Sequence, residues 1–283
     1  MSLNNSWASD SWAWSYSRSK LLRDCPRAFS YATRARKAQA SLNVFSLGAL
    51  IGICVHHAVD DFISRWQEGA PMTLAQLRAT GERQFDERWG QRNQVILEIA
   101  NGVADNSVEP NRFRRAIRER LDRFYQFIWP AFRGSRHECH EEPAEFDILG
   151  HKIRFQIDFA CWNVTDDLQI VDWKTGGAEN QRGGEVQLAV YSLWAHEKFK
   201  LEPHRIKPIV ASLLNGRLFE YEVTPYDLAY VEELVRDDYA ATRVYSTAGA
   251  FPAYPAPEKC GSCRYLKTCP EGRELLSPTD EPT

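Results

Sequence analysis

The pattern of hydrophobic and polar positions divides the chain into two parts that meet near residue 138. In the first part, apolar residues recur every three or four positions, as Val55, Val59 and Phe62 do. This period is typical of amphipathic helices. It predicts a mostly helical first half, with helices over the ranges 17–38, 47–66, 73–100 and 111–132.

After residue 138, short apolar runs are separated by turn residues such as Gly150, a pattern typical of strands. A tight hairpin turn is expected at Asn215-Gly216. The second half is predicted to contain two helices, over 184–199 and 225–245, and then a loop-like segment with several prolines and cysteines. The five predicted strands cover 143–149, 152–162, 168–174, 206–214 and 217–223.

The order of these elements predicts a mixed α/β core with a helical insertion, which we treat as one domain over residues 1–275. The helical part covers about 17–135 and the sheet core about 138–248. A cysteine-rich segment follows over 249–275, and residues 276–283 form a polar tail.

The charge and hydropathy of the whole chain exclude several classes of protein. Its 283 residues include 35 Lys and Arg against 38 Asp and Glu, so the net charge of −3 gives no overall signature of nucleic-acid binding. No apolar run approaches the ~20 residues of a membrane helix. The N-terminal residues are polar and lack the features of a secretion signal. We therefore expect a cytoplasmic protein without membrane contact.

Nucleic acid would have to bind local basic patches. One patch lies within residues 18–37, where Arg18, Lys20 and Arg27 are candidates for contact with DNA. A second basic stretch covers 112–123. The alternative for both stretches is a solvated helix face.

The segment 170–176 carries the most informative chemistry. In a strand, residues two apart point to the same face, so Asp172 and Lys174 would project together. Asp158 on the preceding strand can lie beside Asp172 if the two strands pair. Two adjacent carboxylates repel unless a cation lies between them, and oxygen ligands suit Mg²⁺ or Mn²⁺. A lysine beside such a site suits metal-assisted phosphodiester hydrolysis. The alternative is an ion pair at the end of a strand.

Five short motifs follow one another along the chain: Ser17-x-Ser19-x-Leu21 with Cys25-Pro26-Arg27-x-Phe29, Gly48-x3-Gly52-x2-Val55-His56-x-Ala58-Val59, Gln156-Ile157-Asp158, Val171-Asp172-Trp173-Lys174-Thr175-Gly176, and Gln187-x3-Tyr191. In this order they resemble the PD-(D/E)XK nuclease superfamily, specifically its RecB-like branch with an iron–sulfur cluster. That branch includes the AddB nuclease domain and the CRISPR-adaptation exonucleases. The resemblance implies a restriction-endonuclease-like core, in which a mixed central sheet is flanked by helices.

The resemblance also implies roles for residues in these motifs. His56, Asp158 and Asp172 would bind the Mg²⁺ or Mn²⁺ ion, and the backbone carbonyl of Trp173 would complete its ligands. Lys174 would be the catalytic lysine, beside Asp158 and Asp172. For His56 alone, the alternative is an ordinary core or surface histidine.

Gln187 and Tyr191 lie four residues apart on one helical face, and by resemblance they position the DNA near the metal. Their alternative role is packing of the helix against the sheet. The chain departs from the family at Gln156, where glycine is common. The family often has a glutamate on the preceding strand, and the sequence leaves three candidates open: Glu141, Glu142 and Glu145.

Four cysteines have the spacing of a metal site: Cys260, Cys263 and Cys269 lie close together, and Cys25 joins them if the chain ends meet. Spacing alone leaves a zinc ion and a [4Fe–4S] cluster about equally favoured. The resemblance favours [4Fe–4S], with a structural role. The remaining cysteines are expected to be buried thiols: Cys54, Cys139 and Cys161.

These observations predict a metal-dependent DNA nuclease, with an exonuclease on single-stranded or end-containing DNA as the leading interpretation. The first alternative is a nuclease-fold DNA-binding or assembly module that acts only within a helicase, integrase or repair complex. The second is a structural protein in which a zinc ion holds distant segments together and the Asp-x-Lys motif is a coincidence. DNA repair, CRISPR adaptation and mobile-element or phage biology all fit the leading interpretation.

Overall fold

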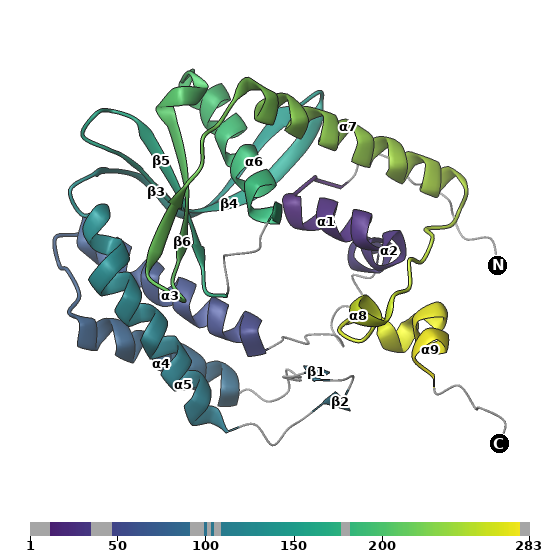
Figure 1. Cartoon of the computed structure of the whole chain (residues 1–283), viewed down its shortest axis with the longest axis horizontal. Helices are drawn as coiled ribbons and strands as arrows, with labels where there is room; N and C mark the ends of the chain where they lie inside the picture. Colours follow the sequence, from purple (N-terminus) through teal and green to yellow (C-terminus); the bar gives the residue numbers. More distant parts are fainter. Residues whose placement is uncertain are drawn as a thin grey trace.

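A five-stranded mixed sheet forms the centre of the protein (Figure 1). The computed structural model describes residues 12–34, 47–90, 99–100, 103–104, 109–176 and 182–277. The strands follow the order β3-β4-β5-β6-β7 across the sheet. Their bounds are Arg136–Ile148 for β3, His151–Trp162 for β4, Leu168–Lys174 for β5, Ile206–Ser212 for β6 and Arg217–Glu220 for β7.

The sheet is antiparallel except where β5 and β6 run parallel. Parallel neighbours need a crossover connection, and helix α6 (Arg182–Phe199) provides it. The predicted mixed α/β fold, with its sheet flanked by helices, is confirmed.

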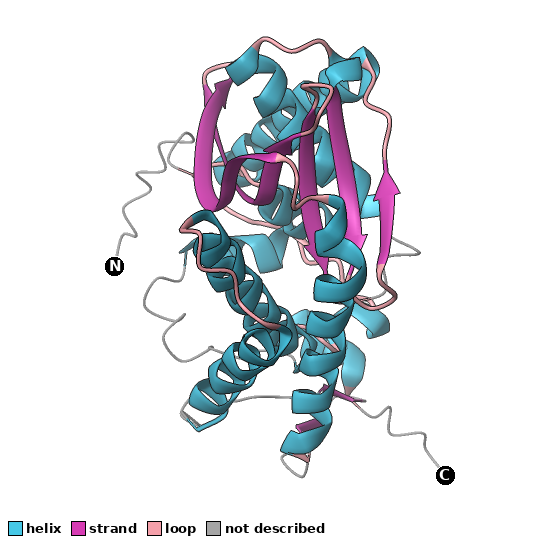
Figure 2. Cartoon of the chain, turned by 90° about the vertical axis from the view of Figure 1, so that its left-hand side faces the viewer, coloured by secondary structure: helices cyan, strands magenta, loops and turns pink. Residues whose placement is uncertain are grey.

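Residues of β5 alternate between two hydrophobic cores. Val171 and Trp173 face the core formed with α3 (Leu47–Gln67), α4 (Leu74–Gly90) and α5 (Pro110–Arg123). Leu168 and Ile170 face the core formed with α6. Figure 1 labels α3, α4 and α5 together at one side of the molecule, and Figure 2 turns that side toward the viewer. Because side chains alternate along a strand, Asp172 and Lys174 share the face of Ile170.

Strand β3 starts at Arg136, seven residues before the predicted start at residue 143. A two-residue turn joins it to β4, with positive φ at Leu149 and Gly150. Turns of this kind match the twist of antiparallel strands. A register shift separates His137 from Cys139, and the pairing beyond it is regular as far as the turn, apart from Glu141.

The predicted helix over 17–38 is two helices, α1 (Tyr16–Asp24) and α2 (Pro26–Arg34). They are separated at Cys25, because Pro26 has no N–H and disfavours a helical residue before it. Residues 35–38 of the prediction lie outside the described residues.

Helix α3 matches its predicted range within one residue, whereas α4 ends earlier than predicted. Helix α4 ends at Gly90, and Ile99–Ala100 form a short strand, β1, that pairs with β2 (Val103–Ala104). Residues 91–98 lie outside the described part of the chain. Helix α5 continues into a π-helical turn, η2 (Phe124–Ile128), and a 3₁₀ turn, η3 (Trp129–Ala131).

The last part of the chain runs back to the N-terminal helices. Helix α7 (Pro225–Thr247) starts with a capping box at Thr224, and two short helices, α8 (Pro257–Cys260) and α9 (Pro270–Leu276), follow. The prediction of a loop beyond residue 249 was therefore wrong in part. In Figure 1, α8 and α9 lie next to α2. No helix in the described ranges is long and apolar enough to span a membrane.

Candidate active site

Three carboxylates lie in a row across β3, β4 and β5. The pairing of β4 with β5 ends at Phe159 and Val171, so Asp158 and Asp172 face each other where the strands stop pairing. There the backbone N–H of Trp173 donates to Asp158 Oδ2 at 2.7 Å, in place of a strand partner. This is the juxtaposition that the strand pattern predicted. Both aspartates are buried, and burial raises the pKa of each carboxyl.

Glu141 is the third carboxylate of the row. It falls between the paired positions His140 and Glu142, which places it opposite Asp158 on the other side of β4. Its backbone has a φ of 44°, in the left-handed region that glutamate rarely adopts. The oxygens of Glu141 and Asp158 lie within 4.8 Å of each other and of a ring nitrogen of His56.

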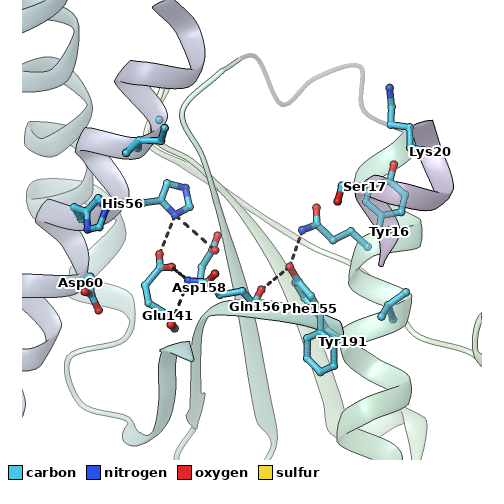
Figure 3. Close-up of a pocket in the computed structure, with 15 residues that line it drawn as sticks. Tyr16, Ser17, Lys20, His56, Asp60, Glu141, Phe155, Gln156, Asp158 and Tyr191 are labelled. Carbon is cyan, nitrogen blue, oxygen red and sulfur yellow. Dashed lines mark hydrogen bonds and ion pairs between the residues drawn. The ribbon is translucent and has the colours of Figure 1, made fainter. Parts of the chain in front are cut away.

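His56 of α3 projects into this acidic row (Figure 3). Its Nδ1 lies 2.9 Å from Glu141 Oε1 and 3.6 Å from Asp158 Oδ1, and its Nε2 lies 3.1 Å from the Trp173 carbonyl. Burial lowers the pKa of His56, but the Asp158 and Glu141 carboxylates outweigh burial and raise it to about 9. A protonated His56 donates through both nitrogens, so its charge balances part of the carboxylate charge.

Lys174 starts a chain of hydrogen bonds that crosses the site. Its Nζ lies 2.6 Å from Asp172 Oδ2 and donates to Gln187 Oε1 at 3.1 Å. Gln187 Nε2 donates to the hydroxyl of Tyr191 at 2.6 Å, and this hydroxyl donates to the Gln156 carbonyl at 2.9 Å. Burial raises the pKa of Tyr191 well above its usual value, so its hydroxyl keeps the proton it donates.

A cavity of about 820 Å³ opens onto the site between α1 and α3. Figure 3 shows Tyr16, Ser17 and Lys20 of α1 across the cavity from His56. Glu141 and the other acidic lining residues lie on its opposite side. The cavity therefore lies between α1, which carries the cation Lys20, and the row of carboxylates.

The sequence left Glu141, Glu142 and Glu145 open, and the structure brings Glu141 into the site. Glu145 instead pairs with Lys152 and Arg154 on the surface. The position of the turn between β3 and β4 distinguishes Glu141 from Glu142 and Glu145. A two-residue turn at 149–150 pairs residues 148 and 151, and counting back along both strands sets 141 against 158.

A model of the PD-(D/E)XK nuclease superfamily matches residues 13–270 of the chain. The chain belongs to the PD-(D/E)XK nuclease superfamily. The match covers every residue of the acidic row, together with His56 and Lys174.

Two phage proteins are similar to this superfamily member. The "Gene 69 protein" of Mycobacterium phage L5 is 29% identical over 131 residues, which cover 46% of this chain and 43% of that protein. The "Gene 69 protein" of Mycobacterium phage D29 is 26% identical over 233 residues, which cover 76% of this chain and 82% of that protein.

One solved structure, of a protein of Eubacterium rectale named as a candidate exonuclease, is similar in fold, with a TM-score of 0.52 and 12% identity. The alignment covers 97% of this chain and 93% of that protein. This likeness supports the restriction-endonuclease-like fold of the superfamily member.

Of the three basic residues predicted to contact DNA, Lys20 lines the cavity. Arg18 Nη1 instead donates to the Ala13 carbonyl at 2.7 Å. Arg27 Nε donates to the Phe251 carbonyl at 2.7 Å, and its guanidinium pairs with Glu271 at 3.2 Å. Arg18 and Arg27 therefore connect parts of the nuclease fold to one another.

Two arginines of the second basic stretch, on α5, pair with acids of α4. Arg114 pairs with Asp86 at 2.7 Å, and Arg118 pairs with Glu82. These ion pairs join the two helices, which favours the solvated-face interpretation for this stretch.

The four predicted cluster cysteines gather at the junction of α1, α2, α8 and α9, apart from the acidic row. Cys25 follows α1, and Cys260, Cys263 and Cys269 belong to the C-terminal segment. Burial raises the pKa of the Cys263 thiol, and the charges of the other three cysteines raise it further. Cys260 Sγ and Cys269 Sγ would both lie within 3.6 Å of a Cβ built at Gly272, so these two thiols flank the same glycine.

Proposed function

We propose that this nuclease-superfamily chain is a Mg²⁺- or Mn²⁺-dependent DNA exonuclease of the RecB-like branch, acting on single-stranded or end-containing DNA. The observation that carries the proposal is the acidic row of Glu141, Asp158 and Asp172, with His56 on one side and Lys174 on the other. Structural ion pairs rarely gather three carboxylates side by side, because their repulsion is costly without a cation.

The donor atoms fit a hard divalent cation. Carboxylate oxygens of Asp158, Asp172 and Glu141, together with the Trp173 carbonyl, are the ligands that Mg²⁺ and Mn²⁺ prefer. The imidazole of His56 would be an additional ligand once it loses its proton. A bound cation of this class would polarise the scissile phosphate and lower the pKa of an attacking water.

The residues of the chain position the reactants around such an ion. Lys174 carries a positive charge 2.6 Å from Asp172, where it can stabilise charge that develops on the phosphate oxygens. Gln187 accepts a hydrogen bond from Lys174, and Tyr191 in turn holds Gln187. The lysine is therefore oriented from two sides before substrate arrives.

The size of the cavity supports an unpaired DNA end as the substrate. Its volume of about 820 Å³ lies within the range of pockets that hold one small molecule, roughly 300–1,000 Å³. A pocket of that size accommodates a nucleotide or two of single strand. Lys20 can neutralise a phosphate there, and Tyr16 offers an aromatic ring to a base.

We also propose that Cys25, Cys260, Cys263 and Cys269 hold a structural [4Fe–4S] cluster. Gly272 leaves room beside the thiols, since a Cβ there would lie 3.5 Å from Cys260 Sγ and 3.6 Å from Cys269 Sγ. One early cysteine followed by a late Cys-x2-Cys-x5-Cys, together with the family resemblance, supports a cluster of four irons over one zinc ion.

The proposal is tested with anaerobically purified protein and end-labelled single- and double-stranded DNA, in Mn²⁺, Mg²⁺ or EDTA. We expect metal-dependent cleavage that starts at ends, and a loss of about 10³-fold or more with Lys174→Ala. Lys152→Ala is the matched control, because Lys152 is exposed and pairs with Glu145 away from the cavity.

Three results would contradict parts of the proposal. Full cleavage by Lys174→Ala would contradict the assignment of the site. Cleavage within closed circular DNA would contradict the exonuclease mode. An absence of cleavage by folded wild-type protein would favour the assembly module that acts with a helicase, integrase or other DNA-processing partner.

A further inference from the structure

Gln156 contacts Glu141 through both of its amide hydrogens. Its Nε2 lies 2.6 Å from Glu141 Oε2 and 3.2 Å from the Glu141 backbone carbonyl. Figure 3 shows the Gln156 side chain between Glu141 and Tyr191, on the wall of the cavity. Gln156 lies two residues before Asp158 on β4, so both side chains project from the same face of the strand.

These two hydrogen bonds act on a residue whose backbone is strained. Glu141 has its φ at 44° and interrupts the regular pairing of β3 with β4. A non-glycine residue stays in this conformation only where its surroundings hold it. The bond to the carbonyl fixes the Glu141 backbone, and the bond to Oε2 fixes the rotation of its carboxylate.

The same contacts decide which oxygen of Glu141 faces the candidate metal position. Oε2 is held by Gln156, which leaves Oε1 directed at His56 Nδ1, the atom that Asp158 Oδ1 also approaches. An amide is neutral, so it orients the carboxylate without adding a positive charge that would repel a cation.

We propose that Gln156 is a positioning residue that presents Glu141 Oε1 to the divalent cation. The inference rests on the proposed metal-dependent function, and it adds a supporting contact made by this chain's own residue. Its expected consequence concerns the affinity for the metal more than the cleavage rate at saturating metal. Removing a group that orients a metal ligand typically weakens metal binding about 10- to 100-fold.

The test is a Mn²⁺ titration of the full chain by isothermal calorimetry and by electron paramagnetic resonance, without DNA. Gln156→Ala is expected to weaken Mn²⁺ binding about tenfold. Arg154→Ala is the matched control, since Arg154 lies on the same strand and pairs with Glu145 away from the cavity. Melting in EDTA verifies that each variant is folded.

A double-mutant cycle with Glu141→Ala shows whether Gln156 acts through Glu141. We expect Gln156→Ala to cause no further loss of Mn²⁺ affinity once Glu141 is replaced. Unchanged Mn²⁺ affinity in Gln156→Ala would overturn the inference, and so would equal losses with and without Glu141. Since these readouts measure binding without DNA, a failure of the proposed nuclease activity would be seen separately, in the cleavage assay.

Discussion

His56 sets the charge of the metal-free site. It lies among three carboxylates, and its pKa of about 9 keeps it protonated near neutral pH. A protonated imidazole has no lone pair for a metal ion, so a divalent cation at the proposed site would compete with the proton on His56. We therefore expect His56 to release its proton when the divalent cation binds.

This competition predicts that Mn²⁺ binds more tightly as pH rises from about 6.5 to about 9, by up to tenfold per pH unit for one released proton. Above pH 9 the affinity should level off. Calorimetry in buffers of different ionisation enthalpy measures both the affinity and the proton release. His56→Gln should bind Mn²⁺ more weakly and with a much smaller pH dependence.

The stability of the protein in EDTA should fall as pH rises, which is opposite to the trend expected for its Mn²⁺ affinity. The folded-state pKa of His56 lies above its unfolded value of ~6.5, so the stabilisation from charged His56 is complete below that pH. It is lost as pH rises toward 9. Melting temperatures measured in EDTA at pH 6.5 and 9.5 check this trend in stability. For the preceding prediction, a Mn²⁺ affinity that does not vary with pH would contradict the assignment of His56.

At the scale of single elements, the sequence predicted element boundaries best for strands and helices that have apolar residues on both faces. Strands β4 and β5 and helix α6 match their predicted ranges within two residues. The first half of β3 was missed because polar residues of the site interrupt its alternation, from His137 to Glu142. Residues at functional sites commonly break the local pattern in this way.

The candidate site was more predictable than some element boundaries. Asp158, Asp172 and Lys174 could be placed together because strand periodicity fixes their face. The link from Gln156 to Glu141 could not be predicted, since it depends on a left-handed residue within β3. The division of α1 from α2 could have been predicted from Pro26 alone.

The packing of α4 against α5 depends on Gly81. A Cβ built at Gly81 would lie 2.6 Å from Leu121 Cδ1 and 2.9 Å from Ile117 Cγ2, and both of these side chains are fully buried. Gly81→Val should therefore destabilise the fold by about 1–3 kcal/mol through overpacking. Gly90→Ala at the end of the same helix has no atom within 4 Å and should leave stability nearly unchanged. Urea unfolding measures both variants, and equal midpoints would contradict this account of the contact.

At the scale of the whole molecule, the N-terminal segment is bound to elements far along the sequence. The backbone of Trp14 pairs with β4 beside Ile153, and its indole Nε1 donates to Asp238 of α7 at 2.8 Å. Arg23 also donates to this buried aspartate, at 3.0 Å. Local patterns contain no information on contacts across 224 residues, so none of this could be predicted from the sequence.

The proposed cluster would add a further long-range connection, between Cys25 and the C-terminal cysteines such as Cys260. Closing a loop this long constrains the unfolded chain, and cross-links of that kind typically contribute about 2–5 kcal/mol. Cys260→Ala is therefore expected to lower the melting temperature by roughly 5–15 °C and to remove bound iron with its visible absorbance. Cys139→Ala, which replaces a buried thiol outside the cluster, should keep the iron.

The acidic row and the cavity are built from β3, β4, β5, α1, α3 and α6, whereas the cysteines occupy the junction of α1, α2, α8 and α9. Because α1 belongs to both regions, loss of the cluster should loosen the Lys20 side of the cavity and leave the acidic side in place. Well below the melting temperature, Cys260→Ala should therefore keep its Mn²⁺ affinity and show a higher KM for DNA. A loss of Mn²⁺ affinity would indicate that the cluster also supports the acidic row, and zinc in place of iron in the wild-type protein would contradict the proposed [4Fe–4S] cluster.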